Sequence, residues 1–448
     1  MANKQLTLVL NQVLERVEPP KEDIDFITEY LKDFINGVKK EIKKQRIVVE
    51  VFVGGSFAKK TMIKKDKYDV DVFLRFDKKY GNKISELAKK LIKEKYEVIH
   101  GSRDYFRIKV NPHFSIELIP VIKVSKPELS ENITDLSYSH VRYINKKMKN
   151  KKLLDEIKIA KAFCYANNCY GAESYIGGFS GYALELLVYH YGSFIKFLKG
   201  ILKGGEGENK HKGIWTKEYE KKYDDLNKKI VIDIEKNYKN KAEILIDLNS
   251  AKLQSPIVLI DPTFQQRNVS AALSEETLDK FKKSAKKFLK TPSIKAFETE
   301  KIDYEKEKGN AKKNKKEFIL IEIETDKQEG DVAGSKLLKF YKHISEEIEK
   351  FFNLKNKGFE YNDRKTARVF FSANQKKEIL FEGPLVKDEK SVGFFKKWHK
   401  NTFEKKGRVF AREKVNVSLG EFIKKWVEKN SKKVKEMYIE KLEIKDVL

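Results

Sequence analysis

The sequence has few of the residues from which covalent or metal cross-links are built. Its 448 residues include only two cysteines, Cys164 and Cys169, which excludes a disulfide framework and a cysteine-based zinc site. None of the seven histidines forms a closely spaced pair of the kind that binds zinc. These absences predict a reduced, cytoplasmic setting.

Long apolar runs are also missing. The most apolar stretch, residues 182–198, is interrupted by Glu185, His190 and Lys196, so it does not read as a membrane span. The N-terminus begins with a polar, charged segment instead of the apolar core of a signal peptide. The sequence therefore predicts no membrane association.

Acidic residues are scarce relative to basic ones. The chain has 67 Asp and Glu against 94 Lys and Arg, a formal net charge of +27. Such an excess suits a polyanionic partner and favours nucleic acid, although a lysine-rich genome or habitat is an alternative cause. An apolar content of 40% predicts a globular protein, and the length allows two to four domains.

Two acids on one predicted strand carry the strongest chemical pattern. Asp69 and Asp71 follow Ser56 by 13 and 15 residues, within a strand predicted at residues 68–73. Alternation along a strand places both carboxylates on the same face, where they repel each other unless a cation lies between them. Mg²⁺ is the cation that commonly lies between such carboxylates in proteins. The alternative is a half-buried strand whose solvent-exposed face is acidic.

A glycine-serine turn precedes these acids. Residues 46–53 predict a strand that ends at Gly54-Gly55-Ser56, and residues 57–62 predict a short helix. A strand, a glycine-rich turn and a helix together favour an anion site, because free backbone N–H groups point at a phosphate. Lys59 or Lys60 would add positive charge to this site.

A third acid completes the pattern. Residues 105–110 and 114–124 predict two strands, and the second places Glu117 among apolar neighbours. A lone carboxylate there is costly unless it is paired or bound to metal, so a salt bridge to a lysine is the alternative. Three carboxylates beside a phosphate-binding turn predict two-metal phosphoryl or nucleotidyl transfer.

The remaining chain divides into a helical and a mixed region. A helix through Ile157 and Lys161 is predicted to end at Asn167, Ser180 is predicted to cap the next helix, and residues 203–210 predict an exposed loop. The basic segment 310–316 predicts a solvated loop, with a phosphate clamp as the alternative. Beyond it we expect a strand at 318–323 and a helix at 335–352 with Leu338, Tyr341, Ile344 and Ile348 on one side. Two strands that pair as neighbours follow at 367–372 and 378–382, and two helices at 394–399 and 419–438.

The motifs resemble a known superfamily. Gly-Gly-Ser, the Asp-x-Asp pair and the later isolated acid are similar to the polymerase-β-like nucleotidyltransferases. Further motifs resemble the archaeal, class I CCA-adding tRNA nucleotidyltransferases: residues 170–173, 178–182, 261–269 and 383–389. This resemblance covers most of the chain. It implies an α+β fold with a mixed-sheet catalytic head (1–142), a helical central domain (143–290) and a C-terminal α+β body and tail that binds tRNA (291–448).

The resemblance also implies an activity. The enzyme would add C, C and A to the 3′ end of tRNA from CTP and ATP without a nucleic-acid template, releasing pyrophosphate. Two Mg²⁺ ions held by Asp69, Asp71 and Glu117 would activate the terminal hydroxyl for in-line attack on the α-phosphate. The acceptor and T stems of tRNA would be the partner, and the oligomeric state stays open, with a homodimer as one alternative.

Further residues would bind the nucleotide, and Arg267 would read the base with its rigid fork of donors. The full set implied by the resemblance is Gly55, Ser56, Lys59, His140, Lys161, Tyr170 and Arg267. Three departures stand out: Lys59 replaces the usual arginine, Glu117 replaces the usual aspartate, and a Thr-Pro pair before His140 is absent.

Two other functions compete with this interpretation. A poly(A) polymerase or an oligoadenylate-synthetase-like enzyme would use the same head chemistry. A non-catalytic RNA-binding scaffold with a decayed head is the alternative from another class, and the presence of all three carboxylates argues against it.

Overall fold

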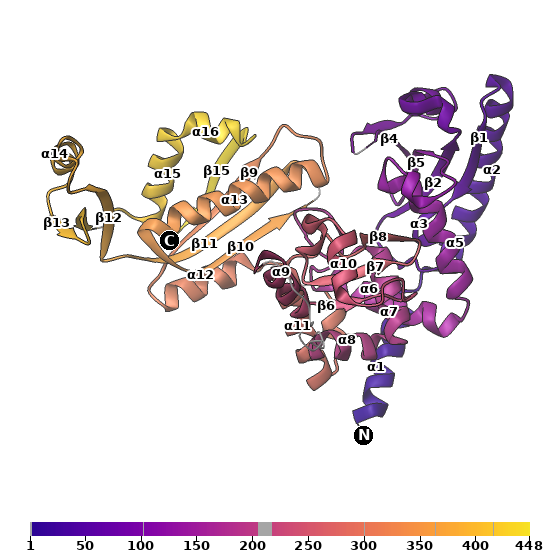
Figure 1. Cartoon of the computed structure of the whole chain (residues 1–448), viewed down its shortest axis with the longest axis horizontal. Helices are drawn as coiled ribbons and strands as arrows, with labels where there is room; N and C mark the ends of the chain where they lie inside the picture. The colour runs from indigo at the N-terminus through magenta and orange to yellow at the C-terminus, as the bar shows by residue number, and fades with distance from the viewer. Residues whose placement is uncertain (1, 102, 205–216, 300, 363, 415) are drawn as a thin grey trace. The chain divides into compact units, whose positions relative to one another are not determined.

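The computed structural model describes residues 2–101, 103–204, 217–299, 301–362, 364–414 and 416–448. The chain folds as two compact units, residues 1–300 and 301–448 (Figure 1). From residue 205 onward, the loop predicted at residues 203–210 falls outside the described residues. Across the described ranges, no helix is both long and apolar enough to cross a membrane.

A five-stranded mixed sheet forms the head of the first unit. Its strand order is β1-β2-β5-β4-β3, with β2 and β5 parallel and the other neighbours antiparallel. Helix α2 (Lys21–Gln45) packs a stripe of buried residues, Ile27 to Val38, into the core of this sheet, and Figure 1 shows it alongside the strands. The strands and short helices are β1 (Val49–Val53), α3 (Gly55–Ala58), β2 (Tyr68–Phe76), α4 (Ile84–Lys89), β3 (Glu97–Ile99), β4 (Tyr105–Asn111) and β5 (Phe114–Ile122).

The strands predicted for the head are present, but the first of them begins later than expected. The strand expected from residue 46 begins at Val49, because α2 runs to Gln45 and Arg46 takes a left-handed conformation that ends the helix. The short helix after the glycine turn also ends early, at Ala58. The mixed-sheet head is therefore confirmed.

Helices surround a second core in the same unit. The helix predicted through Lys161 is α6, and Asn167 ends it as expected. Ser180 is confirmed as the cap of α7, where its hydroxyl accepts a hydrogen bond from the Ala183 amide. The helices of this part are α1 (Ala2–Val17), α5 (Ser137–Lys147), α6 (Lys151–Ala166), α7 (Gly181–Tyr191), α8 (Phe194–Lys203), α9 (Lys217–Asn227), α10 (Lys241–Asp247) and α11 (Glu275–Lys290).

This second core includes residues from both ends of the first unit. Val9 and Val13 of α1 belong to the same core as α6, α7 and α8, and α1 packs against α6, although α1 precedes the head in sequence. The division expected near residue 142 stays a prediction.

A small sheet inside the helical region was not predicted. It has the order β6-β7-β8, formed by Ile230–Ile232, Ile257–Asp261 and Phe264–Asn268. Every residue of β7 is buried, so its sequence lacks the alternation of apolar and polar residues that marks a half-exposed strand. Periodicity alone does not distinguish such a short buried strand from a segment of a buried helix. The purely helical interpretation of this region is therefore corrected.

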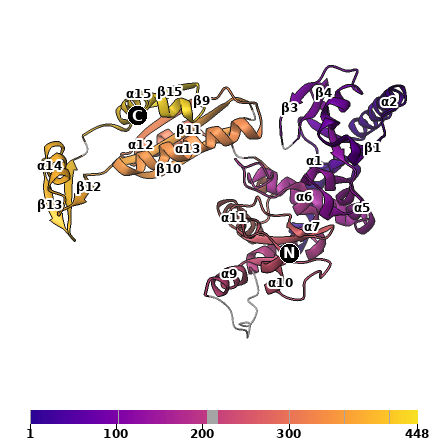
Figure 2. The same ribbon diagram turned by 45° about the horizontal axis from the view of Figure 1, so that its top comes forward.

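The second unit is built on an antiparallel sheet of order β10-β11-β9-β15. Figure 1 shows α13 lying across this sheet, and Figure 2 shows α14 alongside β12 and β13 of a smaller sheet, β12-β14-β13. The elements are α12 (Tyr304–Lys313), β9 (Glu317–Glu324), α13 (Asp331–Phe351), β10 (Phe352–Tyr361), β11 (Thr366–Gln375), β12 (Glu378–Leu385), α14 (Glu389–Trp398), β13 (Thr402–Lys405), β14 (Arg408–Lys414), α15 (Leu419–Lys429), α16 (Ser431–Glu436) and β15 (Lys441–Val447).

Strand pairing in this unit corrects one prediction. Residues 367–372 and 378–382 do not pair with each other, because β11 pairs with β9 and β10 while β12 pairs with β14. Strand β10 was missed because its polar residues mask the alternation of a strand. Strands β13, β14 and β15 were missed as well.

Three helical predictions are also corrected. The loop expected at 310–316 is helical through Lys313, with Ala311 buried. The buried stripe of α13 runs through Leu337 and Phe340 to Ile344 and Ile348, one position away from the expected Leu338 and Tyr341. The long helix expected at 419–438 breaks at Asn430. The α+β fold class is nevertheless confirmed.

Candidate active site

The glycine-serine turn lies directly against the acidic strand. Gly55 has a φ of +61°, and a Cβ added there would meet the Asp71 Oδ2 at 1.7 Å. The Gly54 amide donates a hydrogen bond of 2.8 Å to the Asp71 carbonyl. Only glycine satisfies both the left-handed conformation and this approach, so the turn and the carboxylate are adjacent by steric necessity.

The three predicted carboxylates lie on neighbouring strands. Asp69 and Asp71 share one face of β2 while Val70 and Val72 are fully buried, and Glu117 of β5 is paired with Asp71 in register. The Ser115 hydroxyl donates a hydrogen bond to Asp69.

Glu117 has a partner of its own. It accepts hydrogen bonds from Arg107 Nη2 at 2.8 Å and Nε at 3.2 Å. The salt-bridge alternative is therefore present, with an arginine in place of the expected lysine. Among the described residues, no three His, Cys, Asp or Glu side chains are arranged as a metal-binding group.

The acidic face carries negative charge that the protein compensates only in part. Burial, and next the charge of Glu117, raise the pKa of Asp71 to about 7, although Lys59 opposes this shift. Burial also raises the pKa of Glu117 despite Arg107. The donor set consists of carboxylate oxygens, which hard cations such as Mg²⁺ prefer. This donor set suits a divalent cation by its chemistry, although its spacing in this structure is not that of a metal-binding group.

The two predicted lysines meet at a buried glutamate. Lys59 Nζ lies 2.7 Å from Glu185 Oε2, and Lys161 Nζ lies 2.8 Å from Glu185 Oε1. Glu185 of α7 is fully buried, and Lys161 is 1% exposed. The sequence interpretation noted Glu185 only as an interruption of an apolar run, and a charge inside so apolar a helix was the available clue.

Tyr170 stands at the start of α7, beside Lys161. A Cβ added at Gly181 would meet the Tyr170 hydroxyl at 3.0 Å and Lys161 Nζ at 3.7 Å. The glycine therefore leaves room for both polar groups. Burial raises the pKa of Tyr170, so its hydroxyl stays protonated and able to donate.

Arg267 belongs to a second polar cluster. Its Nη1 lies 2.7 Å from Asp261 Oδ2 and 3.2 Å from His140 Nε2, and that nitrogen lies 3.1 Å from the same Asp261 oxygen. Burial opposes ionisation of Asp261, but His140 and Arg267 outweigh it and hold the pKa of this carboxyl well below its usual range. Burial also lowers the pKa of His140, which favours a neutral imidazole.

Tyr182 connects the two clusters. Its ring stacks on His140 with centroids 4.2 Å apart, and its hydroxyl donates a bond of 3.1 Å to Asp261. Lys59 Nζ lies 5.7 Å from the centroid of the same ring, and the Arg267 guanidinium carbon 5.9 Å. Tyr182 therefore lies between Lys59 of the first cluster and Arg267 of the second.

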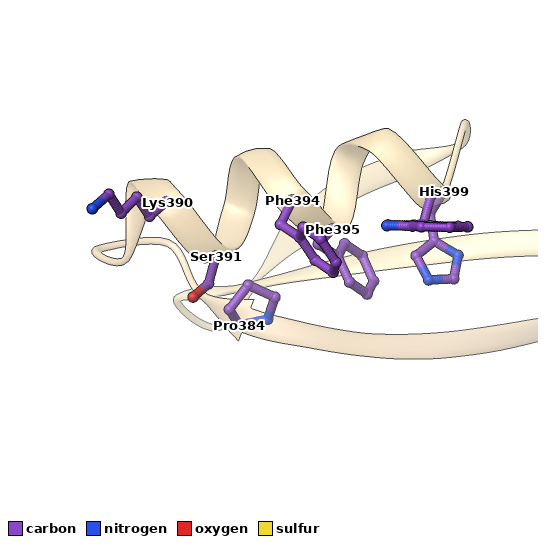
Figure 3. Close-up of a pocket in the computed structure, with 7 residues that line it drawn as sticks. Pro384, Lys390, Ser391, Phe394, Phe395 and His399 are labelled. Atoms are coloured by element: carbon purple, nitrogen blue, oxygen red, sulfur yellow. The ribbon is translucent and has the colours of Figure 1, made fainter.

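The second unit has a separate aromatic surface on α14. An open hollow of about 710 Å³ is lined by residues of this helix and the adjoining β12. Phe394 is 67% and Trp398 is 72% exposed. Figure 3 shows the rings of Phe394 and Phe395 next to Pro384, between the helix and the neighbouring strands. Lys390, Lys396 and Lys397 lie on the same helix.

Comparison with known sequences agrees with the motifs. A family model described as tRNA nucleotidyltransferase, second domain, matches residues 155–298. The CCA-adding enzyme of Nanoarchaeum equitans is 39% identical over 58% of this chain, and that match spans 59% of the relative's length. The CCA-adding enzyme of Methanocaldococcus jannaschii is 29% identical over 90% of this chain and 85% of its own.

Comparison with solved structures gives a more distant likeness. The Cid1 poly(U) polymerase with magnesium and 3′-dATP is 13% identical, with a TM-score of 0.48. The alignment covers 66% of this chain and 99% of that chain.

Proposed function

We propose that the chain is a tRNA nucleotidyltransferase of the archaeal, CCA-adding type, and that it adds C, C and A to the 3′ end of tRNA. CTP and ATP would be the substrates, and pyrophosphate would be released. The observation that carries this proposal is a series of proximities: Gly55 lies against Asp71, the charge of Lys59 acts on Asp71, and Lys59 and Arg267 both lie near the ring of Tyr182. These proximities support the proposal that the acidic face, Lys59 and Arg267 serve one site.

The acidic face would perform the chemistry. Two Mg²⁺ ions at Asp69, Asp71 and Glu117 would lower the pKa of the attacking 3′-hydroxyl and neutralise the leaving pyrophosphate. Gly55 keeps the turn against Asp71, and Ser115 holds Asp69 by a hydrogen bond. Arg107 fixes the orientation of Glu117 on the neighbouring strand. The chain thus supplies three oriented carboxylates along one edge.

The triphosphate would lie between the turn and the two lysines. Ser56 offers a hydroxyl, and Tyr170 offers a phenol beside Lys161 at the start of α7. Lys59 follows Ser56 by three residues, and its charge already acts on Asp71. Charge-assisted hydrogen bonds from both lysines would anchor the phosphates.

Arg267 would select the base. Asp261 and His140 contact one nitrogen of its guanidinium, so the side chain is held in a single orientation. The remaining donors of the rigid fork are suited to the acceptors on the Watson–Crick edge of C or A. His140 would support this orientation more than it would contact the triphosphate.

The acceptor and T stems of tRNA would bind through charge and stacking. The net charge of +27 predicts several phosphate contacts and a steep dependence on salt. Exposed aromatic side chains beside lysines, as on α14, are typical stacking platforms for RNA bases.

A gel assay tests the proposal directly. Purified full chain is incubated with tRNA that ends at its discriminator base, and each labelled nucleotide is supplied separately and then with CTP and ATP together. We expect two additions from CTP alone and a third only when ATP is also present. Long adenosine tails from ATP alone would favour a poly(A) polymerase instead, and RNA binding without any addition would favour the scaffold.

A further inference from the structure

One buried carboxylate receives both lysines that the proposed function assigns to the triphosphate. Glu185 accepts a hydrogen bond from Lys59 at Oε2 and from Lys161 at Oε1, at 2.7 and 2.8 Å. The Thr61 hydroxyl donates to the same Oε1 at 2.7 Å and lies 2.8 Å from Lys161 Nζ. Four side chains from three segments of the chain therefore meet at one point.

We propose that Glu185 is a positioning residue that holds Lys59 and Lys161 in a single arrangement, so that a triphosphate meets two aligned ammonium groups. This inference rests on the proposed function of the site. Lys59 follows α3 in the head, and Lys161 lies in α6 of the helical part. Within the contacts described here, Glu185 is the group that both ammonium ions share.

The charge balance of the cluster favours this role over a purely structural one. Two lysines face one carboxylate, which leaves an excess positive charge at a buried position. Burial opposes ionisation of Glu185, but both lysines outweigh it and lower its pKa to about 2. Burial lowers the pKa of Lys161 to about 8. A phosphate chain would supply the missing negative charge.

Loss of the Glu185 charge should therefore disturb the lysines. The two lysines contact different oxygens of Glu185, and in Glu185→Gln one of these becomes an NH2 donor, so one ammonium group loses its partner. That group would turn away or lose its proton, because two neighbouring buried ammonium ions repel each other. Either change removes one cation from the site that we assign to the triphosphate.

Binding of inorganic tripolyphosphate to the full chain tests this without nucleotide addition. Titration calorimetry should show at least about tenfold weaker binding for Glu185→Gln than for the wild type, as expected for one lost charge-assisted bond. In the gel assay, the KM for CTP should rise by a similar factor while kcat changes less, because the carboxylates of the acidic face are untouched.

A double-mutant comparison separates positioning from general stability. If Glu185 acts through the lysines, Glu185→Gln should weaken tripolyphosphate binding clearly less in a Lys161→Met background than in the wild type. Fully additive losses would overturn the proposal.

A control variant removes a carboxylate that pairs with another lysine of α6. Glu18→Gln removes the carboxylate that pairs with Lys158 of α6 at 2.7 Å, away from the site, and should leave tripolyphosphate binding unchanged. Should Glu185→Gln fail to fold, Thr61→Val keeps the carboxylate and removes the bridging hydroxyl. That variant should bind tripolyphosphate several times more weakly, and unchanged binding would overturn the proposal.

The remaining outcomes distinguish this inference from the proposed function. A folded Glu185→Gln protein with normal binding and a normal KM would refute the positioning role alone. If tripolyphosphate binding depends on Glu185 but the wild-type protein adds no nucleotide to tRNA, the proposed function is refuted and the positioning role is supported.

Discussion

Asp71 and Asp261 are two carboxylates of one site in opposite surroundings. Asp261 is fully buried and is hydrogen-bonded by Arg267, by the Tyr182 hydroxyl and by both the amide and the hydroxyl of Thr263. Its pKa lies well below the usual range, since His140, Arg267 and the Thr263 amide outweigh its burial. The pKa of Asp71 is instead raised to about 7, by burial and by the neighbouring Glu117.

The contrast indicates what each region is built to do. Around Asp261 the protein supplies every partner, which fixes the orientation of Arg267 without help from a ligand. Around Asp71 the protein brings negative groups together and leaves part of their charge uncompensated. Such a face gains most from a cation that comes from outside the chain. The first region suits the base-reading role that we propose for Arg267, and the second suits the divalent cation that we propose at Asp71.

The largest effect should come from removing the acidic face. Asp69→Ala, Asp71→Ala or Glu117→Ala should each reduce nucleotide addition on the order of ten-thousandfold, because groups that act as one unit fail together. The measurement is single-turnover addition of CTP to tRNA that lacks its end. Filter binding of tRNA should stay close to the wild type.

Glu117→Asp is the control for this prediction. It keeps the charge and shortens the side chain by one methylene, so it should be the mildest of these changes. Near wild-type turnover for any of the three alanine variants at saturating magnesium would remove that residue from the proposed ligand set.

The next effect should be one of stability, with opposite signs in the two regions. Asp261→Asn leaves Arg267 without its buried partner and should cost about 3 kcal/mol of unfolding free energy. Asp71→Asn relieves repulsion and should stabilise the metal-free protein by about 1 kcal/mol. Urea unfolding at neutral pH measures both. Equal signs for the two variants would contradict the comparison.

A smaller effect should appear in nucleotide choice. Arg267→Ala should lower the rate of C and A addition, because the Watson–Crick edge of the base loses its hydrogen-bond donor. The preference for C and A over U and G should fall about ten- to a hundredfold. Competition assays with pairs of nucleotides give the ratio. If the variant kept both its rate and its selectivity, Arg267 would not read the base, and Asp261 would be tested next.

The smallest effect should be a pH dependence carried by Asp71. Its pKa in the folded protein is about 7 against an ordinary 3.8, so between these values the folded state binds more protons than the unfolded state. Stability should therefore fall as pH rises through this range, by about 1 kcal/mol after allowance for solvent. In Asp71→Asn, the midpoint of urea unfolding should lack this part of its pH dependence. An identical pH profile in both proteins would refute the raised pKa.

Much of the fold near the site could be predicted from sequence. The acidic strand, the glycine turn and the helix through Lys161 each carry a local pattern of period two, of turn residues or of period 3.6. Strand β7, which ends at Asp261, was missed because a fully buried strand has no alternation. The pairing of β11 was wrong, because strand neighbours depend on the path of the whole chain.

The sequence by itself determined the local elements that carry most of the proposed site residues, because glycine turns, helix caps and side-chain periodicity act over a few residues. Only the tertiary structure decided their partners. Glu117 is paired with Arg107. Glu185 is paired with Lys161 and also with Lys59, which precedes Glu185 by 126 residues. The reason is that a buried charge takes whichever opposite charge the folded chain places within a few ångströms, and that distance has no local signature.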